Sequence, residues 1–149
     1  MNRRHNRNRA EHTGKRVIVI TTKQIHALRL RETDIESVMR RLNNNQSVYE
    51  TCLLAFLEDT TVAELNAALT HKLWDDAFTA AHALKGVAGN MGFIPLMHHT
   101  AQLIILIRSG KTQDIPQSLE RVNSSYRDIV DAIHRYFTLC EGEQKGDTT

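Results

Sequence analysis

The apolar residues between positions 74 and 91 recur in alternating steps of three and four, and this spacing constrains the fold more than any other feature of the chain. The stripe contains Trp74, Ala77, Ala81, Leu84, Ala88 and Met91. Such steps place every member on one face of an α-helix, in the pattern of a helical-bundle seam. The spacing predicts a helix from about Trp74 to Asn90 with one buried face.

Three further segments show a helical period. One opens at the capping box Ser47–Glu50 and is expected to be a single long helix. Another runs from Pro95, which suits a first helical turn, to Gly110, and the last begins with an Asp114 cap. The first of these stripes contains Tyr49, Leu53, Phe56, Ala63 and Ala67, and the last contains Leu119, Val122, Tyr126, Ile129, Ile133, Tyr136 or Phe137, and Cys140. No segment alternates with period two for long enough to be a strand. Four amphipathic helices joined by short turns predict an all-α fold, an antiparallel up-down four-helix bundle.

The charge of the chain is unevenly distributed. Residues 1–32 hold nine Lys and Arg against two Glu, whereas the rest holds ten Lys and Arg against fifteen Asp and Glu. We expect a basic, flexible arm over 1–32, in which a capping box of Thr21 and Gln24 allows a short helix. A helical domain over 33–140 and a disordered tail over 141–149 would follow. A solvated arm is the commoner interpretation of such a segment, and a nucleic-acid tether is the less favoured alternative.

The composition excludes several classes of protein. The 149 residues fit one domain, and two prolines and seven glycines favour helices over a turn-rich β fold. Cys52 and Cys140 form neither a disulfide framework nor a metal-binding spacing. His98 and His99 are adjacent and face different directions on a helix, so no metal site is predicted. With no apolar run that could span a bilayer, and no signal peptide, we expect a soluble cytoplasmic protein with no membrane partner.

One histidine of the helix from Trp74 to Asn90 points away from the core. His82 falls about 130° from the centre of the apolar stripe. Gly86 and Gly89 also point outward and remove side chains beside the imidazole, although each glycine costs a helix interior roughly 1 kcal/mol relative to alanine. Lys85 adds a positive charge nearby. This arrangement suits a macromolecular partner that brings an anionic group, such as a phosphoryl group, to His82. The plainer alternatives are an ordinary surface histidine and glycines that permit close helix packing.

The stretch HALKGVAGNMG, residues 82–92, resembles the signature of histidine-containing phosphotransfer (Hpt) domains. The similarity extends over roughly residues 33–137. It implies a four-helix bundle with an extra short N-terminal helix, which the capping box Thr33–Glu36 would open. It also implies that His82 is the phospho-accepting residue, that Lys85 neutralises the phosphoryl group, and that Gly86 leaves room for it. Gly92 matches the glycine that ends this helix.

The chain departs from the family pattern at Ile104. Family members usually carry Gln or Glu at this position, near the accepting histidine. Isoleucine cannot hydrogen-bond to the imidazole, so the orientation of His82 is expected to depend on water or a backbone group. The segment LIILI at 103–107 is apolar all round, which suits either core packing or a docking patch. Gly89 and Ile104 are the candidate docking residues.

The resemblance implies nucleophilic phosphoryl exchange. The neutral imidazole of His82 would attack the aspartyl phosphate of a receiver domain and later return the phosphoryl group to another aspartate. The implied partners are response-regulator receiver domains and a sensor or hybrid histidine kinase. Mg²⁺ is expected on the receiver, and no cofactor on this chain. No glycine-rich nucleotide loop is present, so no ATP-dependent kinase activity is expected. The alternative is a helical interaction module that binds receiver or kinase domains without phosphotransfer.

Overall fold

The computed structural model describes residues 22–29 and 31–143, and over these ranges the chain is almost entirely helical. The elements are α1 (Thr22–Arg29), α2 (Ile35–Arg41), α3 (Gln46–Glu58), α4 (Thr61–Thr70), α5 (Trp74–Asn90), α6 (Ile94–Ser109), the 3₁₀ turn η1 (Thr112–Asp114) and α7 (Ile115–Glu143). No strand occurs in these ranges, and Thr33 and Phe93 form only an isolated bridge. The predicted all-α class is confirmed.

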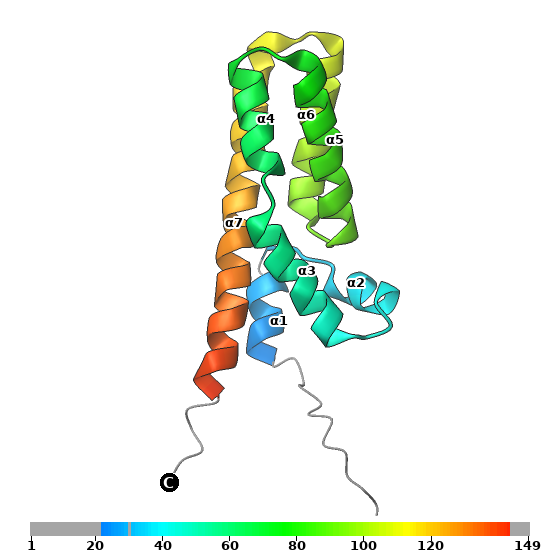
Figure 1. The fold of residues 1–149 in the computed structure, drawn as a ribbon, viewed down its shortest axis with the longest axis vertical. Helices are drawn as coiled ribbons and strands as arrows, with labels where there is room; N and C mark the ends of the chain where they lie inside the picture. Colours follow the sequence, from blue (N-terminus) through cyan, green and yellow to red (C-terminus); the bar gives the residue numbers. More distant parts are fainter. Residues whose placement is uncertain (1–21, 30, 144–149) are drawn as a thin grey trace, which may run out of the picture.

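Four helices form the predicted antiparallel up-down bundle (Figure 1). α5 packs against α4 and α6, and the first half of α7 closes the bundle against α6 and α4. α7 continues beyond the bundle, where α1 packs along it. α2 and α3 lie near the end of the bundle at which α5 turns into α6. The N-terminal addition therefore consists of two short helices, α1 and α2.

The helix expected to begin at Ser47 is not continuous, because it breaks between α3 and α4. Asp59 has extended backbone angles (φ −68°, ψ 130°), and its carboxylate accepts a hydrogen bond from the Thr61 amide at 2.8 Å. This break resets the phase of the buried stripe. Ala63 and Ala67, expected inside, are exposed. The buried residues of α4 are Val62, Leu65, Ala68 and Leu69.

The helix caps differ from the predicted capping boxes. Asp34, not Thr33, caps α2, with its carboxylate accepting from the Ser37 amide at 3.1 Å. Asn45, not Ser47, caps α3 by accepting from the Val48 amide at 3.1 Å. Asp and Asn accept such bonds at least as well as Ser and Thr, and each stands next to the expected cap. Asp114 ends η1 immediately before α7, and Thr21 lies outside the described residues.

The core runs through the bundle and continues between α1 and α7. Leu28 of α1 is fully buried, and the Gln24 amide donates to the Tyr136 carbonyl of α7 at 3.3 Å. Part of the expected basic arm therefore contributes to the core. Trp74, expected on the buried stripe, is 38 % exposed, because it is the first residue of α5 and lies at the end of the bundle. The remaining members of that stripe are buried, as predicted.

Candidate functional site

The imidazole of His82 lies on the exposed side of α5, as predicted. Ala81 and Leu84, on either side of it in the sequence, are buried in the core of the bundle. The apolar spacing of α5 is therefore sufficient to place His82 outside. Lys85 is also exposed, and no ion pair with its ammonium group is found among the described residues. Its charge remains available to an incoming anion.

The glycines on the outer side of α5 have different surroundings. A Cβ atom at Gly86 would have no neighbour within 4 Å, so this glycine leaves open space one turn beyond His82. A Cβ atom at Gly89 would lie 3.3 Å from the Met97 sulfur of α6. Gly89 is half-buried against α6, so it serves close helix packing, and the docking role predicted for it is not supported by its position.

Gly92 belongs to the turn that ends α5. Its φ is +70°, and the amide of Phe93 donates to the Ala88 carbonyl at 2.9 Å, while that of Gly92 donates to the Gly89 carbonyl at 3.3 Å. These two bonds are the pair that defines a Schellman motif. The Arg41 guanidinium from α2 satisfies a further carbonyl by donating to Asn90 at 2.8 Å. The predicted helix-ending role of Gly92 is confirmed, and α2 packs directly on this end.

The register of α5 and α6 places Ile104 at the level of His82. The proximity of Gly89 to Met97 and of Phe78 to Arg108 fixes how the two antiparallel helices are aligned. The same alignment places His82 and Ile104 at the same level of the two helices, His82 on the exposed side and Ile104 in the core. The side chain of Ile104 is only 8 % exposed and belongs to the core. This position does not support the docking role predicted for Ile104, because a buried side chain presents little surface to a partner. Its neighbour Ile105 is the exposed one, at 64 %.

Two residues near His82 were not identified from the sequence. The imidazole stacks on the ring of Phe78, with ring centroids 5.9 Å apart and ring planes 17° apart. The guanidinium of Arg108, in the last turn of α6, lies over the Phe78 ring at 4.9 Å from its centroid. The separation of four residues between Phe78 and His82 was a usable signal, since such pairs are neighbours on a helix. Arg108 could be found only from the helix register.

The sequence was also compared with models of known protein families. The model of the Hpt domain matches residues 53–136, which is more than half of the chain. The chain belongs to the Hpt domain family. Searches of curated proteins and of solved structures found no match. The matched range starts within α3, so α1 and α2 lie outside it.

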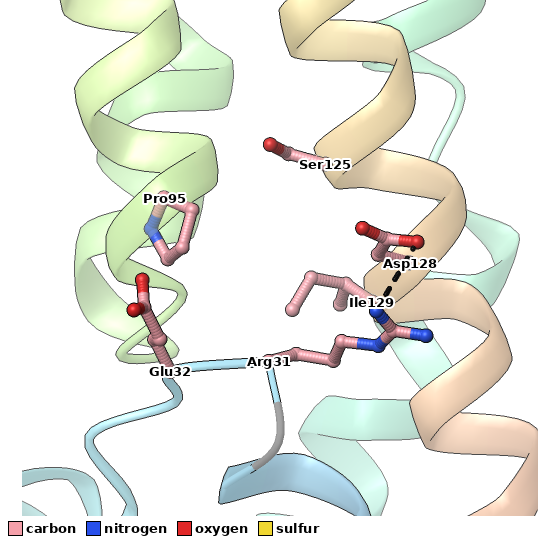
Figure 2. A pocket seen from close by; sticks show the side chains of 6 residues that line it. All are labelled: Arg31, Glu32, Pro95, Ser125, Asp128 and Ile129. Atoms are coloured by element: carbon pink, nitrogen blue, oxygen red, sulfur yellow. Dashed lines mark ion pairs between the residues drawn. The ribbon is translucent and has the colours of Figure 1, made fainter.

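One cavity among the described residues contains no residue of α5 in its lining. Its volume is about 200 Å³, and Figure 2 shows the side chains that line it. Its lining residues are Arg31, Glu32, Pro95, Ser125, Asp128 and Ile129. The Arg31 guanidinium pairs with the Asp128 carboxylate at 3.5 Å, which ties the segment before α2 to α7. The cavity therefore lies between the segment before α2, α6 and α7. The candidate site around His82, by contrast, is an exposed surface.

Within the described residues, no three His, Cys, Asp or Glu side chains gather as a metal ion would require. Among the helices in these ranges, none combines the length and apolar content needed to cross a bilayer.

Proposed function

We propose that this Hpt domain carries phosphoryl groups between receiver domains in a multistep phosphorelay. His82 accepts the group from a receiver-domain aspartate and passes it to another receiver. The observation that carries the proposal is the exposed imidazole beside Gly86, where a Cβ atom would meet no neighbour within 4 Å. Glycine is unfavourable within a helix, and among the described residues no neighbour of its Cβ position requires glycine there.

The chemistry follows from the residues at this surface. An unprotonated imidazole nitrogen of His82 attacks the phosphorus of an aspartyl phosphate, and a P–N bond forms as the bond to the carboxylate oxygen breaks. The carboxylate leaves with the electron pair, and the reverse step loads the next receiver. Lys85 supplies positive charge beside the phosphoryl group, and the open space over Gly86 admits the partner. Mg²⁺ on the receiver supplies further charge stabilisation.

Incubation with a phosphorylated receiver domain tests the proposal. We expect label to move to the Hpt domain in an acid-labile, base-stable form, as a P–N bond requires. His82→Gln should abolish labelling and leave the helical circular dichroism unchanged. His134→Gln, at an exposed histidine of α7, is the matched control and should label like the wild type. Labelling that persists in His82→Gln refutes the assignment of the acceptor. A wild-type protein that binds the receiver but takes no label supports the non-catalytic interaction module instead.

A further inference from the structure

The aromatic ring of Phe78 lies beside the His82 imidazole. Helical side chains lean toward the N-terminus of their helix, so His82 leans over the residue four positions before it. The two rings stack at 5.9 Å with a 17° angle between their planes. Phe78 is half-buried and packs against the core, whereas His82 is exposed. The phenyl ring is therefore the anchored member of the pair.

Arg108 holds the phenyl ring from the neighbouring helix. Its guanidinium lies 4.9 Å from the centroid of the Phe78 ring, which is within the range of a cation–π interaction. No carboxylate partner of Arg108 is found in the described part of the chain, so no ion pair draws it from the ring. Phe78 belongs to α5 and Arg108 to α6. The contact therefore forms only when the two helices are aligned in this register.

No other side chain in the described residues is shown to orient the imidazole. Ile104, which lies at the level of His82, is apolar and buried, and no hydrogen bond to the His82 ring is found among the described side chains. Gly86 leaves the next turn of the helix open. The imidazole is therefore supported on the side of Phe78 and free on the side of Gly86.

We propose that Phe78, held by Arg108, is a positioning residue for His82, an inference that rests on the proposed function. At a centroid separation of 5.9 Å the nearly parallel rings are offset, so Phe78 lies beside the imidazole and leaves its edge accessible. The lone pair that attacks phosphorus lies in the ring plane at that edge. In-line transfer requires this lone pair to point along the breaking P–O bond. The stack limits rotation of the ring and raises the fraction of time in which the lone pair is aligned with a docked receiver.

The decisive comparison is between Phe78→Leu and Phe78→Tyr. Leucine keeps an apolar side chain against the core but removes the ring, whereas tyrosine keeps the ring. With a phosphorylated receiver, Phe78→Leu should lower the saturating transfer rate roughly twofold to tenfold without changing the receiver concentration at half-maximal rate. Phe78→Tyr should transfer at nearly the wild-type rate. Arg108→Met, which keeps length but removes the charge, should lower the rate by a smaller factor, about twofold.

A small phosphoryl donor separates orientation from reactivity. Phosphoramidate reaches the imidazole from any direction, so its rate of labelling His82 should be the same in wild type and Phe78→Leu. The matched control is Phe137→Leu, which removes a half-buried ring of α7 in contact with Tyr136, away from α5. It should leave both rates unchanged. The NMR signals of the His82 ring protons should lose their ring-current shift in Phe78→Leu and keep it in Phe137→Leu.

The outcomes distinguish the two proposals. A wild-type protein that takes no label from a receiver refutes the proposed function, and the NMR comparison then still tests the stack. If wild type transfers and Phe78→Leu matches it, Phe78 does not position His82. If Phe78→Leu raises the receiver concentration at half-maximal rate, Phe78 is a docking contact. If phosphoramidate labels Phe78→Leu more slowly than wild type, Phe78 acts on the reactivity of the imidazole. Either result overturns the positioning role.

Discussion

The middle of α5 and its C-terminal end each carry a glycine, and the two have opposite surroundings. At Gly86 a Cβ atom would meet nothing within 4 Å, whereas at Gly92 it would lie 2.8 Å from the Asp34 carbonyl oxygen and 2.9 Å from a methyl group of Val38. Gly92 also has a φ of +70°, which L-amino acids with side chains rarely adopt. The fold needs glycine at position 92 and has no need of it at position 86.

This difference separates a glycine that the fold requires from one to which the proposed function gives a role. Gly92 allows the chain to reverse between α5 and α6 while α2 packs on the turn. Gly86 lowers helix stability by roughly 1 kcal/mol relative to alanine and gains no internal contact in return. A residue that weakens the fold beside an exposed histidine is best explained by an interaction outside the chain. Substitutions at the two glycines should therefore affect different measurements.

The largest effect is expected from Gly92→Ala. The left-handed backbone and the contacts with α2 should together lower the free energy of unfolding by about 2–4 kcal/mol, measured by urea denaturation. Gly110→Ala is the matched control, because Gly110 has a φ of +68° but open space around its Cβ position. It should lose only about 1–2 kcal/mol. Equal losses at the two positions would show that the packing of α2 on Gly92 contributes nothing.

Gly86→Gln should affect transfer and not folding. The new side chain enters empty space, so the free energy of unfolding should not fall, but the receiver can no longer approach His82. We expect phosphotransfer to slow by about tenfold or more. Ala63→Gln adds the same side chain to an exposed site of α4 and should transfer normally. Wild-type transfer by Gly86→Gln would mean that the open space has no role in receiver binding.

The smallest effect is expected from Gly86→Ala, which should stabilise the domain. Alanine is the better helix former, and no neighbour is in the way, so thermal or urea unfolding should show a gain of up to about 1 kcal/mol. Transfer should stay within about twofold of wild type. Gly89→Ala should gain less, because the sulfur of Met97 lies 3.3 Å from the added methyl group. Similar gains at the two positions would contradict the close packing at Gly89.

The local pattern of α5 was sufficient to predict its extent and its exposed face. Its bounds, Trp74 and Asn90, are those expected from the apolar spacing, and Gly92 ends it through backbone bonds within a few residues. The length of the preceding helix was predicted wrongly. The apolar spacing from Tyr49 to Ala67 continues across Asp59, so it does not reveal the extended residue there that moves the buried face of α4 to Val62, Leu65, Ala68 and Leu69.

The exposed positions of His82 and Gly86 and the all-α class follow from helical periodicity, since period is a local property of the chain. The docking of α1 against α7, the burial of Ile104 and the placement of Arg108 over Phe78 were decided by the tertiary structure. These features depend on the register between helices. Register depends on how the side chains of two helices pack together, so it cannot be predicted from the residue spacing within one helix.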